Sequence, residues 1–161
     1  HLEAGVTAAV ASAGVPVHVA DGRAVETLAG ADVAVLASGT AAVEAACAGV
    51  PMVVVYRVSP LTAWIARRFV INGDLERTGF SIPNIVLGRR AVPELLQDHV
   101  TGPRIAREVE ALLNPAAAAR VREDLAEVRR RLGPPGAVER ASVEVLAVLD
   151  ALDRGARATI P

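Results

Sequence analysis

Two short, uninterrupted apolar runs, separated by a segment of helix length, constrain the fold of this chain more than any other feature. The runs occupy residues 33–37 and 52–56, and residues 41–48 between them are mostly alanine and other helix-permissive side chains. Apolar runs that do not alternate with polar residues are typical of strands buried on both faces, as in parallel sheets. The pattern therefore predicts an α/β fold with a doubly wound parallel sheet.

The remaining periodicity extends this pattern over one domain of 161 residues. Residues 16–19 are predicted to form a further strand, residues 71–79 a loop, and residues 81–86 a short extended piece held by Pro83. Helices are predicted over residues 2–10, 23–28, 61–70, 92–97, 103–113, 116–132 and 137–152. About three strands followed by helices are few for a complete doubly wound domain.

Composition excludes several functional classes. Hydrophobic residues make up 52% of the chain and the formal net charge is −1, which argues against disorder and against a basic surface for nucleic acid. Three separated histidines and the single Cys47 give no metal-ligand cluster, and Cys47 is predicted to be a small buried hydrophobe. No apolar run approaches the roughly 18 residues of a membrane span and no signal peptide is evident, so we expect a soluble protein that can still touch a membrane surface.

The segment Ser38-Gly39-Thr40 joins the first apolar run to the following helix. A small-residue loop between strand and helix brings backbone N–H groups and the helix dipole together, which suits a phosphate. Glu44, one turn into that helix, is placed to hold a ribose hydroxyl pair. Two alternatives stay open: Ser38 or Thr40 only caps the helix, and Glu44 only interacts with its dipole.

Polar residues also follow the second apolar run, where the carboxyl end of a parallel strand is a usual ligand position. Arg57, directly after Tyr56, would add a charge-assisted contact to a phosphate. Asn84 follows Pro83, and an asparagine in a loop is more often a turn former than a group that reads a base. An apolar stripe of helical spacing, typical of a core-facing helix, consists of Leu61, Trp64, Ile65 and Phe69.

Taken together and in order, these segments resemble the lipid-A-disaccharide synthase family. The first part of the resemblance is Ala31-Asp32-Val33, residues 38–45, and the run from Gly49-Val50-Pro51 to Thr62. The second part is Trp64-Ile65-Ala66-Arg67-Arg68, Ser81-Ile82-Pro83-Asn84-Ile85-Val86, Gly88-Arg89 and Pro93-Glu94-Leu95-Leu96-Gln97. The resemblance runs from about Val15 to the final helix, and several specific motifs in one order make it a strong signal.

The resemblance implies an inverting glycosyltransferase of the GT-B type, built from two facing Rossmann-like domains. Such an enzyme transfers diacylglucosamine from UDP-2,3-diacylglucosamine to a lipid monosaccharide phosphate, at the cytoplasmic face of the inner membrane and without a required metal or cofactor. Residues 1–161 would form an incomplete C-terminal, donor-binding half. The acceptor domain and the general base are expected outside this chain, so we expect it to bind a nucleotide without catalysing transfer alone.

By the same resemblance, Ser38, Gly39 and Thr40 would contact the diphosphate and Glu44 the nucleoside. Four further residues would line the donor cleft: Tyr56, Arg57, Asn84 and Gln97. The family also implies a homodimer for the whole protein. One departure is the segment 71–80, which is longer than in the family by about five residues, an insertion that loops tolerate cheaply. It leaves the identity of the donor open.

Two other classes of function remain alternatives on the sequence alone. A UDP-sugar epimerase, or a related GT-B protein with another acceptor, shares the architecture and a Ser-Gly followed by a helical glutamate. A non-catalytic interaction module is the third hypothesis, in which the apolar stripe of residues 61–69 faces a partner or acyl chains.

Overall fold

The structure is a computed structural model and describes residues 2–37, 39–59 and 77–157. Three strands form one sheet in the order β1 (Ala34–Ala37), β2 (Met52–Tyr56) and β3 (Glu94–Leu96). Both strand pairs are parallel. The two apolar runs therefore form adjacent parallel strands, as the sequence predicts.

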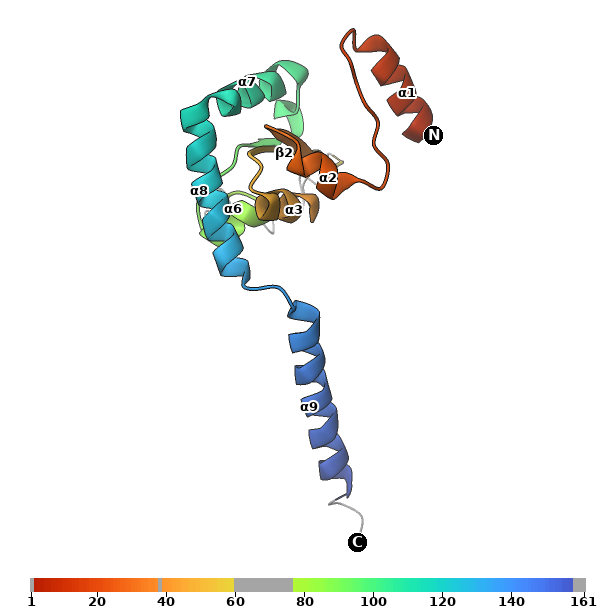
Figure 1. Cartoon of the computed structure of the whole chain (residues 1–161), viewed down its shortest axis with the longest axis vertical. Coiled ribbons are helices and arrows are strands. Elements are labelled where there is room, and N and C mark those ends of the chain that lie inside the picture. Colours follow the sequence, from red (N-terminus) through yellow and green to blue (C-terminus); the bar gives the residue numbers. More distant parts are fainter. Residues whose placement is uncertain (1, 38, 60–76, 158–161) are drawn as a thin grey trace.

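Helices lie on both sides of this sheet (Figure 1). The helices of the described residues are α1 (Leu2–Ser12), α2 (Ala24–Ala29), α3 (Ala41–Ala48), α6 (Ile82–Leu87), α7 (Gly102–Leu113), α8 (Pro115–Leu132) and α9 (Ala137–Arg157), with one 3₁₀ turn, η2 (Gln97–His99). Those that pack on the sheet are α2, α3, α6 and α8 on one face and α7 on the other. The predicted helices over residues 2–10, 23–28, 41–48, 103–113, 116–132 and 137–152 are confirmed, and α9 continues five residues further.

The central strand β2 shows why the sheet is covered on both faces. Met52 and Val54 pack into a core with α3 and α8, in which Leu125 is fully buried. Val53, between them, packs on the opposite face against Leu95 and against Leu112 of α7. Side chains of a strand point alternately to the two faces, so an uninterrupted apolar run buries both. The result is an α/β fold with a parallel sheet and C-terminal helices, consistent with part of a Rossmann-like domain.

Two predicted elements around Pro83 and Pro93 are wrong. Residues 81–86 were expected to be extended, but α6 forms there, with Ser81 extended as its N-cap and Pro83 in the first turn. Proline is tolerated in a first helical turn because its missing N–H has no intrahelical partner there. Residues 92–97 were expected to be helical, but residues 94–96 are β3, because their backbone pairs with β2.

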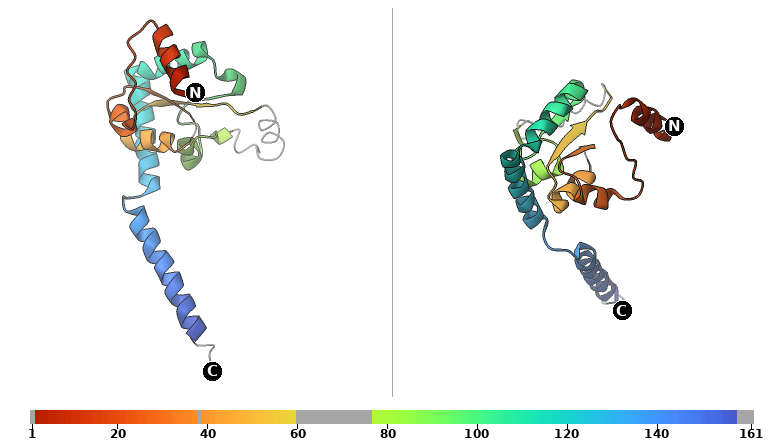
Figure 2. Two further views of the ribbon diagram at one scale, coloured as in Figure 1. Left: turned by 90° about the vertical axis from the view of Figure 1, so that its right-hand side faces the viewer. Right: turned by 45° about the horizontal axis from the view of Figure 1, so that its top comes forward.

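The predicted strand at residues 16–19 is also wrong. This segment has no strand hydrogen bonds, and Val15, Val17 and Val19 are exposed. A short apolar run becomes a strand only when it finds a sheet edge to pair with, and this run leads from α1 to α2 beside the sheet (Figure 1). At the other end of the chain, α9 extends away from the domain beyond α8 (Figure 2).

Two more predictions concern single features. Cys47, predicted to be buried, is exposed near the C-terminal end of α3, since the buried face of this helix is formed by Ala42, Ala45 and Ala46. The predicted helix at 61–70, with its apolar stripe, lies outside the described residues.

Candidate functional site

The carboxyl ends of the three strands form one edge of the sheet, and most of the predicted site residues follow these ends. β1 ends at Ala37, opposite Val55, and β2 ends one step later at Tyr56, opposite Leu96. Neighbouring strands lie about 4.8 Å apart, so three chain segments leave this edge within about 10 Å of one another. They carry Gly39 and Thr40 after β1, Arg57 after β2, and Gln97 after β3. Ser38 lies outside the described residues.

The loop between β1 and α3 is open to solvent and depends on a glycine. Gly39 has φ +151°, a conformation that residues with a Cβ rarely adopt, and among the described residues other than its chain neighbours no heavy atom lies within 4 Å of where a Cβ would be. Thr40 is the N-cap residue of α3, but its side chain makes no capping hydrogen bond. The capping alternative for Thr40 is therefore not realised, although the prediction that it contacts a phosphate stays a prediction.

Glu44 and the end of β2 are also accessible. Glu44 is exposed in the first turn of α3, four residues after Thr40, so both lie on the same side of the helix. Tyr56 is 43% exposed at the end of β2, and Arg57 beside it is exposed. These side chains provide hydroxyl, carboxylate and guanidinium groups at one edge, a set that can bind phosphate and ribose.

Asn84 has a different environment, because it is fully buried and bonded within the protein. Its Nδ2 donates to the Val92 carbonyl at 3.0 Å and to Glu94 Oε1 at 2.8 Å. Its Oδ1 accepts the backbone N–H groups of Ala91 at 2.7 Å and of Val92 at 2.9 Å. All four hydrogen-bonding positions of the amide are used, so Asn84 joins α6 to the start of β3. That it also faces a donor stays a prediction.

Glu94 belongs to the same network, although its position in the sequence does not predict this role. Its carboxylate accepts the backbone N–H of Phe80 at 2.9 and 3.0 Å and that of Ser81 at 2.6 Å. A Cβ on Gly79 would lie 2.6 Å from Glu94 Oε2, and Gly79 has φ +97°, so the chain needs glycine there. The sequence does contain one indication of this role. Glu94 is the only charged residue in the apolar run 92–96, and a charged side chain in such a run needs hydrogen-bond partners.

Gln97 holds the segment that follows β2. Its Oε1 accepts the Val58 backbone N–H at 2.8 Å, and its Nε2 donates to the Val58 carbonyl at 3.0 Å. The amide is partly buried, and both of its polar atoms are bonded to one backbone residue. Contact between Gln97 and a donor likewise stays a prediction.

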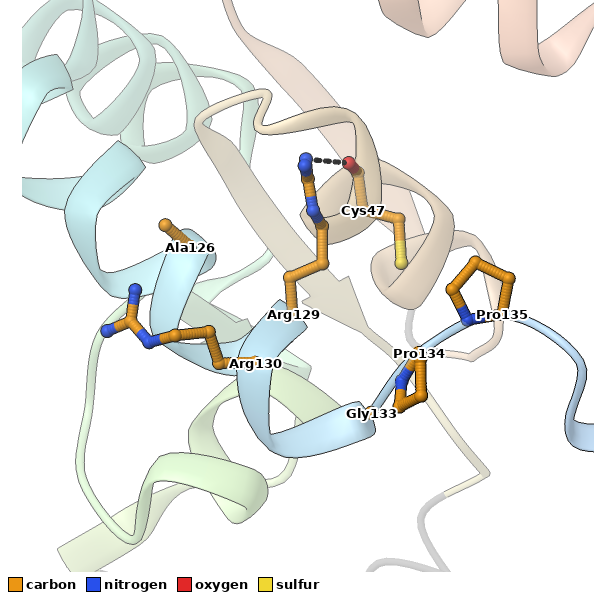
Figure 3. A pocket seen from close by; sticks show the side chains of 7 residues that line it. All are labelled: Cys47, Ala126, Arg129, Arg130, Gly133, Pro134 and Pro135. Atoms are coloured by element: carbon orange, nitrogen blue, oxygen red, sulfur yellow. Dashed lines mark hydrogen bonds between the residues drawn. The ribbon is translucent and has the colours of Figure 1, made fainter.

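A surface hollow lies near the opposite end of α3 (Figure 3). Arg129 of α8 crosses it and donates from Nη1 to the Cys47 carbonyl at 2.9 Å, which satisfies an acceptor in the last turn of α3. Gly133, Pro134 and Pro135 of the connection to α9 line its other side. Thr40 and Cys47 are seven residues apart along α3, about 10 Å, so this hollow is separate from the β1–α3 loop.

Two described residues with shifted pKa values, Arg89 and Glu127, form ion pairs on the helices, away from the carboxyl ends of the strands. Asp124 on α8 binds Arg89 after α6, and this hydrogen bond raises the pKa of the Arg89 guanidinium. Hydrogen bonds from Arg131 and Arg130 lower the pKa of Glu127 on α8. These pairs link or stabilise helices at the surface and add no reactive group to the edge.

Comparison with known proteins decides the family. A model of the family described as lipid-A-disaccharide synthetase matches residues 6–148. The chain belongs to the lipid-A-disaccharide synthase family. The matched range includes the β1–α3 loop, the end of β2, α6 and β3.

Proteins named lipid-A-disaccharide synthase from several bacteria are similar to this chain. The protein of Myxococcus xanthus is 43% identical over 145 residues, which are 89% of this chain and 37% of that protein. The protein of Geobacter sulfurreducens is 40% identical over 141 residues, 87% of this chain and 35% of that protein. The protein of Acidobacterium capsulatum is 47% identical over 133 residues, 80% of this chain and 31% of that protein.

This member of the lipid-A-disaccharide synthase family therefore spans about a third of the length of the curated relatives it matches. Within the described residues, no helix has the length and apolar character needed to cross a membrane.

Proposed function

We propose that this chain is the nucleotide-sugar-binding part of a glycosyltransferase that makes the lipid A disaccharide. The observation that carries the proposal is the family match over residues 6–148, together with relatives named lipid-A-disaccharide synthase. The donor would be UDP-2,3-diacylglucosamine and the acceptor a lipid monosaccharide phosphate, with inversion at the transferred sugar. In a protein that continues beyond this chain as its relatives do, the acceptor domain and the general base would lie in the remainder.

The arrangement of the edge supports a donor role for the β1–α3 loop. No described residue beyond its chain neighbours fills the space beside Gly39, and the Thr40 hydroxyl is not used for capping. The first turn of α3 can therefore present N–H groups and the helix dipole to a diphosphate. Glu44, one turn later and exposed, would accept hydrogen bonds from the ribose hydroxyls. Arg57, after β2, would add a cation for the phosphates. Ser38 and Tyr56 complete the proposed contacts, and Asn84 and Gln97 would lie beside the cleft and hold its backbone.

The other parts of the proposal concern location and assembly. The enzyme would work at the cytoplasmic face of the inner membrane, where its lipid substrates are, as a peripheral protein. A homodimer is proposed for the whole protein.

The test is a transfer assay with a protein that joins this chain to the remainder found in its relatives. UDP-2,3-diacylglucosamine and the lipid monosaccharide phosphate are supplied together, and the products are identified by mass spectrometry. We expect a disaccharide and UDP only when both substrates are present, and loss of product with Glu44→Ala. Donor converted to an isomeric UDP-sugar without acceptor would instead identify an epimerase and contradict the proposal.

A further inference from the structure

Gln97 lies where β3 ends and its main chain leaves the sheet. Upstream in the same pair of strands, Val54 donates its backbone N–H to the Pro93 carbonyl at 2.9 Å. Residues of one strand that bond to the same neighbour recur every second position, so Tyr56 and then Val58 follow Val54 in this ladder. Val58 is thus the residue whose backbone would next be paired with the β3 chain.

The Gln97 main chain does not continue this ladder. Its φ is +50°, and it is the one non-glycine residue with a positive φ in the described part of the chain. Its carbonyl accepts the Val100 N–H at 3.0 Å and so closes the η2 turn. The side-chain amide takes the place of the main chain, with its acceptor on the Val58 N–H and its donor on the Val58 carbonyl. One side chain therefore extends the β2–β3 ladder by one step.

We propose that Gln97 is a positioning residue for Arg57, acting through the Val58 backbone and not through contact with the nucleotide. Arg57 lies between Tyr56, which pairs with β3, and Val58, which Gln97 holds at both backbone polar groups. Fixing the backbone on both sides of a long side chain reduces the entropy that ligand binding must overcome. The left-handed backbone of Gln97 fits this role, since such strain persists where the surroundings determine it and is common at functional sites.

The inference rests on the proposed function for the identity of the ligand, but the hydrogen bonds can be tested without a ligand. Amide hydrogen exchange of Val58, followed by NMR in the isotope-labelled chain, reports its bond to Gln97 directly. With Gln97→Ala we expect Val58 exchange to become about 10-fold faster or more, while Val53 and Val54 in the sheet keep their rates. Gln97→Gly should speed Val58 exchange equally and also relieve the backbone strain at position 97. Comparing Gln97→Ala with Gln97→Gly therefore separates the effect of the lost hydrogen bonds from that of the strain. Asp98→Ala, at an exposed neighbouring position, is the matched control.

A second variant tests the amide chemistry. Gln97→Glu keeps the acceptor for the Val58 N–H, but at neutral pH its second oxygen faces the Val58 carbonyl and cannot donate. We expect weaker UDP binding at pH 7 and recovery toward the wild-type value as the pH falls and the carboxyl group gains a proton. The wild-type chain and Asp98→Ala should not show this recovery, and a loss of packing alone would not be restored by a proton.

UDP titrations of the same proteins complete the test. We expect UDP affinity to fall about 5- to 20-fold in Gln97→Ala, in parallel with the faster Val58 exchange. Unchanged Val58 exchange in Gln97→Ala would overturn the proposed clamp. Weaker UDP binding with unchanged Val58 exchange would make Gln97 a direct ligand contact and also overturn it. If the wild-type chain bound no UDP, the proposed function would fail, and the exchange rates would still decide whether Gln97 holds Val58.

Discussion

The two sides of the sheet edge differ in what their polar side chains are bonded to. After β1, the Thr40 side chain makes no capping bond and Glu44 is exposed. On the β3 side, Asn84, Glu94 and Gln97 bond to backbone groups of the protein itself. The first side leaves these side chains accessible for the ligand that we propose, whereas the second holds its own chain in place. A polar residue near a strand end is therefore assigned to one role or the other by its partners and not by its position.

The largest difference between the two sides should appear with Asn84→Ala. This change removes a fully buried amide together with its hydrogen bonds to the Ala91 N–H, to both backbone groups of Val92 and to Glu94, so we expect a loss of about 3 kcal/mol or more in the free energy of unfolding. Asn114→Ala is the control, because Asn114 is an exposed N-cap of α8, worth about 1 kcal/mol. Urea denaturation measures both. Equal losses would mean that the Asn84 network contributes no more than a surface cap.

Two glycines give the next comparison. Gly79→Ala would place a Cβ 2.6 Å from Glu94 Oε2 at φ +97°, so we expect a loss of about 2–3 kcal/mol. Gly39→Ala meets no atom of the described residues beyond its chain neighbours within 4 Å and should cost only the backbone strain, about 1 kcal/mol. The measurement is again urea denaturation. A larger effect at Gly39 would show that the β1–α3 loop is as tightly built as the β3 side.

A smaller effect is expected for Glu94→Gln. One carboxylate oxygen is replaced by an NH2 group, which donates and cannot accept, so at least one of the bonds from the Phe80 and Ser81 N–H groups is lost, which should cost about 1–2 kcal/mol. Glu110→Gln, on the exposed side of α7, should change stability by less than about 0.5 kcal/mol. If thermal unfolding shows the two variants to be equally stable, Glu94 is not needed to hold residues 79–81.

The sequence predicts the part of the fold that local patterns determine. The apolar runs at 33–37 and 52–56 both form strands, and their composition alone signals this. The expected burial of both faces is confirmed for β2. It is wrong for β1, the outer strand of the sheet, where Val35 is 46% exposed. The segment of α6 was predicted to be extended and that of β3 to be helical. The first prediction was wrong because Pro83 suits either a first helical turn or an extended segment. Residues 94–96 are a strand only through pairing with β2. Tertiary contacts of this kind are not visible in local sequence.

The site was predictable to a similar degree. The edge of the sheet and the loop at Gly39 and Thr40 follow from strand–loop–helix order, which is a local property. The bonds of Asn84 and Gln97 join residues 7 to 39 positions apart, so a sequence shows the residue types but not their partners. This is why both were expected to line a cleft, and why Glu94 received no role.

The smallest effect is expected for an ion pair remote from both sides of the edge. Hydrogen bonds from Arg131 and Arg130 lower the pKa of Glu127 below its ordinary value of 4.5. Its contribution to stability is therefore full above that value and is lost as the pH falls through the lowered pKa of the folded state. Glu127→Gln should reduce this acid-side loss and change little at neutral pH, as unfolding followed across the acid range will show. A large loss of stability at pH 7 would contradict the assignment of Glu127 to a solvent-screened pair.

The central claim is that the β1–α3 side of the edge binds a uridine nucleotide while the β3 side holds its backbone. Calorimetric titration of UDP into the chain and into Glu44→Ala tests it most directly, with Glu110→Ala on the opposite face of the sheet as control. We predict that the wild-type chain and the control bind UDP alike, and that Glu44→Ala binds about 10-fold more weakly with an unchanged melting temperature. Equal binding by Glu44→Ala, or no binding by the wild-type chain, would contradict the claim.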